Sequence, residues 1–150
     1  MIALDTNVLL LLIVGLASPS YIAKHKCLGG RTVNDFEILK LFLEDFQQAV
    51  TLPNVLTEVS NLLGQTHGPT QPLFDVLRHV IANLKEICIP SIQASRRPEF
   101  ARLQLADCAL MEVAKDDVFI LTTDGPLHRA LLAAEYKTAN FTHYMEAARD

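Results

Sequence analysis

Four acidic residues stand where the surrounding sequence is apolar, two at the ends of apolar stretches and two on apolar faces of helical segments. Burying a carboxylate without a partner costs several kcal/mol, so such a group tends to be protonated or paired with a cation. No lysine or arginine occupies a comparable inward position, and oxygen ligands suit Mg²⁺ or Mn²⁺ better than zinc. The sequence therefore predicts a divalent-metal site made by Asp5, Glu58, Asp107 and Asp124.

The two helical acids are identified by their angular position at about 100° per residue. In the segment VLTEVSNLL (55–63), Glu58 falls beside Val55 and Leu62 on the apolar side. In RLQLADCALMEVA (102–114), Asp107 falls inside a face of leucines and alanines. Glu112, on the same helix, points almost directly away from that face and is predicted to lie at the surface.

Each of the four acids also has an ordinary structural explanation. Asp5 and Asp124 could each cap the helix that follows them. Glu58 could reach the edge of its helix, and Asp107 could be a buried acid satisfied by backbone amides. We favour a shared site because four such coincidences in one chain are improbable together, especially with two of the acids at strand ends.

Short apolar strands alternate with helices along the chain, which predicts an α/β fold with a mainly parallel central sheet. In such sheets, ligands bind beyond the carboxyl ends of the strands, where Asp5 and Asp124 are both expected. We predict strands at 2–5, 49–52, 86–90, 118–123 and 139–141, and helices at 6–17, 34–49, 53–65, 73–85, 91–115 and 127–135, with a final helix after the last strand.

The composition is that of one domain with a well-filled core. Half of the 150 residues are hydrophobic, and the mean hydropathy of +0.23 also suits an apolar self-association face. The three cysteines are odd in number and widely spaced, which suits a reducing compartment such as the cytoplasm. The apolar run 8–17 is too short to span a bilayer, and the residues before it lack the basic charge of a signal peptide.

Taken together, these segments resemble the PIN-domain ribonucleases, and among them the short toxins of bacterial and archaeal toxin–antitoxin pairs. The resemblance rests on LDTNVLL at the start, the helical Glu58, LADCALMEVA around Asp107 and ILTTDGPL around Asp124. Their order and spacing cover nearly the whole chain. Two features depart from the family pattern, namely the long segment 18–32 and the Gly-Pro-Leu that follows Asp124.

The resemblance implies a single PIN-like domain over residues 1–150, an α/β/α sandwich that hydrolyses RNA phosphodiesters with Mg²⁺ or Mn²⁺. It makes the four acids the metal-binding groups, with Asp5 and Asp107 as direct ligands. Asn7 and Thr122 match polar positions beside the metal, and Thr6 matches a less strict one. An antitoxin protein and a homodimer held by apolar helices are further expectations from the family.

The net charge of −4 at first counts against an RNA partner. Without the four site acids, however, the remaining 13 acids (17 − 4) balance the 13 lysines and arginines. Two basic groups could contact phosphates, one in the segment 18–32 and one before the Asp107 helix. They are Lys24, Lys26 and Arg31, and Arg96, Arg97 and Arg102.

Other acid-using or hydrolytic classes fit the sequence less well. A haloacid-dehalogenase phosphatase needs a second Asp two residues after the first, and that position is Asn7. A receiver domain needs an Asp at the end of a middle strand, which ICIPS (87–91) lacks, and no GxSxG motif supports a serine hydrolase. The alternative that stays open is a PIN-like RNA-binding or assembly module without significant turnover.

Overall fold

The computed structural model describes residues 1–149 and contains one five-stranded parallel sheet flanked by helices. The strand order is β3-β2-β1-β4-β5, and every neighbouring pair is parallel. The α/β class and the single-domain architecture are therefore confirmed. The strands are β1 (Ile2–Leu4), β2 (Ala49–Thr51), β3 (Lys85–Glu86), β4 (Phe119–Thr122) and β5 (Thr138–Asn140).

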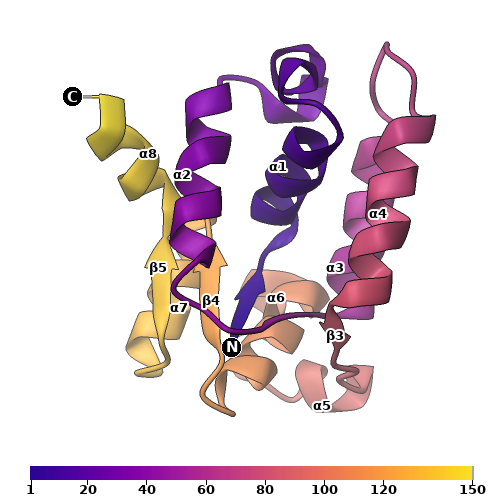
Figure 1. Cartoon of the computed structure of the whole chain (residues 1–150). Helices are drawn as coiled ribbons and strands as arrows, with labels where there is room; N and C mark the ends of the chain where they lie inside the picture. Colours follow the sequence, from indigo (N-terminus) through magenta and orange to yellow (C-terminus); the bar gives the residue numbers. More distant parts are fainter. Residues whose placement is uncertain (150) are drawn as a thin grey trace.

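Helices connect and cover the strands (Figure 1). Each helix follows or precedes a strand. This alternation is typical of parallel sheets, in which a right-handed connection usually joins one strand to the next. The helices are α1 (Thr6–Ala17), α2 (Val33–Leu43), α3 (Pro53–Leu63), α4 (Gln71–Asn83), α5 (Ser91–Ser95), α6 (Phe100–Ala114), α7 (Gly125–Ala133) and α8 (Phe141–Arg149), with 3₁₀ turns η1 (Pro19–Lys24) and η2 (Lys26–Leu28) in the segment 18–32.

The helices form two layers around the sheet. In Figure 1, α2 lies in front of β4 and β5, and α6 and α7 lie behind the sheet. Aromatic contacts join the front layer to the sheet: the ring of Phe42 on α2 lies 5.9 Å from that of Phe119 on β4 and 5.1 Å from that of Tyr144 on α8. These ring contacts pack α2 and α8 together beside β4.

The apolar run that begins the chain forms the centre of the core. All three residues of β1 are buried, as are seven of the twelve residues of α1, which packs against α2, α3 and α4. The close approach of α1 and α2 depends on Gly15, because a Cβ there would lie 2.2 Å from Cδ1 of Phe36. The run 8–17 is thus a core helix, and among the described residues no helix is both long and apolar enough to cross a bilayer.

Three predicted elements differ from the structure. The strand expected at 86–90 is only the pair Lys85–Glu86, since the chain turns away before Pro90, which has no N–H to donate to a sheet. The helix expected at 34–49 ends at Leu43. The helix expected at 91–115 is two helices, α5 and α6, and α6 itself is broken at Gln104, whose φ of 73° is not helical.

Candidate functional site

The order of the strands places two of the predicted acids side by side. β1 pairs with β2 on one side and with β4 on the other, so the sheet reverses its winding between β1 and β4. At such a point the following helices diverge and leave room beyond the strand ends. Leu4 lies opposite Leu121, and the backbone N–H of Asp5 donates to the carbonyl of Leu121 at 3.0 Å. Asp5 and the segment leading to Asp124 therefore meet at this edge.

Asp5 is the most tightly held of the acids. Its Oδ1 accepts a hydrogen bond from the backbone N–H of Val8 at 3.1 Å and so caps α1. Its Oδ2 accepts from the backbone N–H of Thr123 at 3.1 Å and from the hydroxyl of Thr122. Burial raises the pKa of Asp5, and these hydrogen bonds oppose that rise. Oδ1 has only one of these donors, so a carboxylate lone pair stays open to a ligand.

Asp124 begins α7 in the same way. Its Oδ1 accepts from the backbone N–H of Leu127 at 2.9 Å, and its own N–H donates to Oγ1 of Thr122 at 2.9 Å. Both capping explanations are therefore confirmed for the strand-end acids. Capping does not remove either residue from the site, because the side chains of Asp5 and Asp124 both line the cavity described below.

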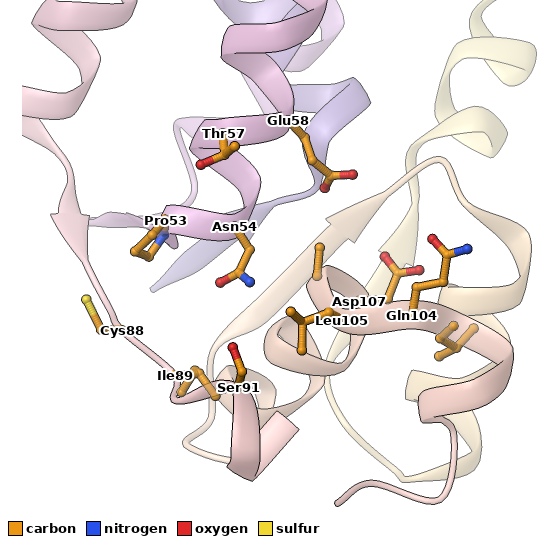
Figure 2. A pocket seen from close by; sticks show the side chains of 12 residues that line it. Pro53, Asn54, Thr57, Glu58, Cys88, Ile89, Ser91, Gln104, Leu105 and Asp107 are labelled. Carbon is orange, nitrogen blue, oxygen red and sulfur yellow. The ribbon is translucent and has the colours of Figure 1, made fainter. Parts of the chain in front are cut away.

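The helical acids come from the opposite wall. Glu58 on α3 is exposed, whereas its position on the apolar side of the helix predicted that it points inward. Its carboxylate accepts a hydrogen bond from the hydroxyl of Thr6 at 2.9 Å. Asp107 on α6 is half-buried. Figure 2 shows the Asp107 carboxylate rising from α6 on the side toward Glu58. Among residues 1–149, no side chain or backbone group donates a hydrogen bond to Asp107.

One cavity of about 410 Å³ joins all four acids. Burial, and after it the nearby charges of Asp124, Asp5 and Glu58, together raise the pKa of Asp107 to about 7. The four carboxylates thus influence one another electrostatically. The cavity is lined by Asp5, Thr6, Asn7, Glu58, Asn61, Leu62, Gln104, Ala106, Asp107, Leu110 and Asp124, with no lysine, arginine, histidine or cysteine.

The donor set fits a hard divalent cation in its chemistry. It consists of carboxylate oxygens with neighbouring amide and hydroxyl groups, the ligands that Mg²⁺ and Mn²⁺ take, and it lacks the nitrogen and sulfur donors that zinc favours. Within residues 1–149, however, no three acidic, histidine or cysteine side chains are close enough together to hold one ion. Chelation therefore requires side chains of the cavity to move closer together.

Thr122, Thr6 and Asn7 all lie beside the acids. Thr122 is buried and links the two strand-end acids, donating to Asp5 and accepting from the N–H of Asp124. Thr6 orients Glu58, and Asn7 lines the cavity. This is the arrangement expected of groups that hold ligands in place.

Two polar cavity residues were not identified from the sequence, Asn61 and Gln104. Asn61 follows Glu58 by three positions, so helical spacing could have found it. Gln104 precedes Asp107 by three positions but has a φ of 73°, which no sequence pattern indicated. A non-glycine residue in that conformation stores strain and is found preferentially at functional sites.

The predicted basic groups are not part of the cavity wall. Lys24 lines a separate pocket formed with the α3–α4 connection. Lys26, Arg96 and Arg102 are exposed and Arg31 is half-buried. Arg97 is bound to two carboxylates, with Nε 3.2 Å from Glu99 and Nη1 2.6 Å from Glu112, so its guanidinium is not available for RNA phosphates.

The prediction that Glu112 lies at the surface was wrong. Glu112 is 5% exposed, and its oxygens accept hydrogen bonds from Arg97, Lys115 and Gln93. The physical reason is that α5 and the α5–α6 connection cover the side of α6 opposite Asp107. Glu112 lies opposite the face that carries Asp107, but α5 and the α5–α6 connection cover it there.

Comparison with known proteins gives no further identification. No protein-family model matches the sequence, and no curated protein matches it either.

Proposed function

We propose that this protein is a Mg²⁺- or Mn²⁺-dependent endoribonuclease, acting in the cytoplasm as the toxin of a toxin–antitoxin pair and forming a homodimer. The observation that carries the enzymatic part is the convergence of Asp5, Glu58, Asp107 and Asp124 on one cavity whose wall has no cationic side chain. The toxin role and the antitoxin rest on the resemblance to PIN-domain toxins alone. The cytoplasmic compartment and the homodimer rest on that resemblance together with the cysteine pattern and the high mean hydropathy.

The acids differ in how firmly hydrogen bonds hold their side chains. Asp5 is fixed by hydrogen bonds from Val8, Thr122 and Thr123, so it presents its carboxylate in one orientation. Asp107 and Glu58 approach from α6 and α3 with fewer constraints. We assign direct ligation to Asp5 and Asp107, while Glu58 and Asp124 complete the ligand set or orient the attacking water.

A bound divalent cation would supply positive charge to the scissile phosphate and lower the pKa of a water molecule. The chain's own contribution is to bring carboxylates together at a strand edge while excluding basic side chains that would compete for them. Asn7 and Asn61, which line the same cavity, can donate hydrogen bonds to phosphate or ribose oxygens.

The direct test is cleavage of a structured RNA pool by the purified protein in Mg²⁺ or Mn²⁺, with EDTA as the control. We expect cleavage in metal and none in EDTA. The rival function, an RNA-binding or assembly module, predicts binding without cleavage under both conditions. It is favoured by one observation, that no three ligand-type side chains among residues 1–149 already stand at chelating distance.

A further inference from the structure

A second pocket of about 630 Å³ continues from the acid-lined cavity. The two share Glu58, Gln104, Ala106 and Asp107 as a common wall. The second pocket then extends between the start of α3 and the residues around α5 (Figure 2), and Asp5 and Asp124 do not line it. A molecule bound at the acids can therefore extend past these four residues into the second pocket.

The lining of this second pocket differs in chemistry from that of the first. Beyond the shared wall it presents neutral hydrogen-bonding groups and aliphatic carbon, and no lysine, arginine or histidine. A phosphate or another anion would find no countercharge there. The neutral polar side chains are those of Asn54, Thr57 and Ser91, with Gln104 of the shared wall, and the aliphatic ones include Ile89 and Leu105.

These polar groups are available to a ligand. Within residues 1–149, the side chains of Asn54, Ser91 and Gln104 make no hydrogen bonds to other protein groups. Figure 2 shows the Asn54 amide on α3 and the Ser91 hydroxyl on α5 facing each other across the pocket, with Leu105 on α6 beside them. The pocket thus offers donors and acceptors at its edge and an apolar surface alongside.

We propose, on the basis of the ribonuclease function proposed above, that this pocket binds an unpaired nucleobase of the RNA strand whose phosphate lies at the acids. A nucleobase is a flat, neutral heterocycle with donors and acceptors on its edge, which matches amide edges and aliphatic faces without a charged partner. The site therefore takes single-stranded or looped RNA, because a base stacked in a duplex cannot enter.

Gln104 has a particular place in this arrangement, since it lines both pockets. Its positive φ interrupts α6 three residues before Asp107 and turns the chain at the junction of the two pockets. Its amide can bridge the nucleotide held at the acids and the base beside it. Strain at this position is consistent with selection for placement of the side chain rather than for helix stability.

The test uses neutral nucleosides, which carry no phosphate and need no metal, so its outcome does not depend on nuclease activity. The four ribonucleosides, with ribose as control, are titrated at millimolar concentration into isotopically labelled protein while the side-chain amides are followed by NMR. We expect at least one nucleoside, but not ribose, to shift the amide signals of Asn54 and Gln104. No shift with any nucleoside overturns the proposal, even if the protein cleaves RNA.

A matched pair of variants locates the binding. Asn54→Ala should weaken nucleoside binding about tenfold, the loss of one or two hydrogen bonds. It should not unfold α3, because alanine is the better helix former. Gln47→Ala removes an exposed amide outside the pocket and should leave the affinity unchanged. Equal affinity of Asn54→Ala and the parent overturns the proposal.

A third measurement addresses the unpaired state of the base. A short single-stranded RNA should shift the Asn54 and Gln104 amides, and the same sequence annealed into a duplex should not. If the duplex shifts both signals as strongly as the single strand does, the base-binding pocket is refuted. If only the nuclease proposal is wrong, nucleosides still bind in this pocket, but the protein cleaves no RNA in the presence of metal.

Discussion

Helix α6 carries two carboxylates five residues apart that the fold treats in opposite ways. Glu112 accepts hydrogen bonds from Arg97 at 2.6 Å, Lys115 at 3.1 Å and Gln93 at 2.8 Å. Although burial alone would raise the pKa of Glu112, these partners lower it below its ordinary value. Asp107 has no such partner among the described residues, and its pKa rises to about 7.

The difference lies in what surrounds each carboxylate. Around Glu112 the chain supplies its own cations, and these ion pairs, with the hydrogen bond from Gln93, join α5, the α5–α6 connection and α6. Around Asp107 the nearest charges are other acids, so compensation must come from outside the protein. Arg97 also lies over the ring of Tyr136, 5.6 Å from its centre, which ties the compensated cluster to the segment before β5.

The largest expected effect distinguishes the two acids by activity. Asp107→Asn should lower the rate of Mn²⁺-dependent RNA cleavage about a thousandfold, because it removes a proposed metal ligand, whose loss would cost several kcal/mol of transition-state stabilisation. Glu112→Gln, on the same helix, should retain activity because it leaves the cavity intact. Cleavage rates of the two variants, measured at matched folded concentration, provide the test, and equal rates for Asp107→Asn and the parent would exclude Asp107 as a ligand.

The next effect is on stability and concerns the compensated acid. Arg97→Met should lower the free energy of unfolding by about 3 kcal/mol, because it leaves the carboxylate of Glu112 buried without its closest cation. Chemical denaturation of the metal-free protein measures this change. Arg96→Met, at the adjacent exposed position, is the matched control and should change stability little. A small effect of Arg97→Met would mean that Lys115 and Gln93 suffice.

A smaller effect concerns pH and the uncompensated acid. The folded protein holds a proton on Asp107 up to about pH 7, whereas the ordinary pKa is 3.8. The stability that this group contributes is therefore present at about pH 4 and is lost as the pH rises through about 7. The amide in Asp107→Asn does not ionise, so this variant keeps its stability as the pH rises. At pH 8 it should be more stable than the parent by about 2 kcal/mol, which is less than the pKa shift alone would give because the side chain is partly hydrated.

Denaturation of parent and variant at pH 4, 6 and 8 without metal is the measurement. The stability difference between them should grow with pH. If it stays constant across this range, Asp107 is not held in its neutral form by its surroundings.

The smallest expected effect is a thermal shift. Mn²⁺ at about ten times its dissociation constant should raise the melting temperature by about 4 °C, because the folded site binds the ion and the unfolded chain does not. Glu112→Gln should show the same shift, and Asp107→Asn should show none. An equal shift in both variants would place the ion elsewhere on the protein.

Much of the fold followed from local patterns in the sequence. The bounds of α1 and the starts of α3 and β2 agree with the prediction because a continuous apolar run, a Pro at the first helical turn and a short β-branched stretch each favour one structure. The shortened β3 and the break at Gln104 were not predictable in this way. Both depend on how the segment 84–104 crosses from the sheet edge to the back of the molecule.

What the sequence by itself determined is the identity of the acids at 5, 58, 107 and 124 and the elements that carry them, since a charge within an apolar pattern is visible locally. Only the tertiary structure decided that these four line one cavity, while Glu112 is buried with Arg97 on the far side of the same helix. The physical reason is that helical periodicity gives the direction of a side chain but not what packs against it. Which carboxylate receives a cation from the chain itself depends on contacts between segments far apart in the sequence.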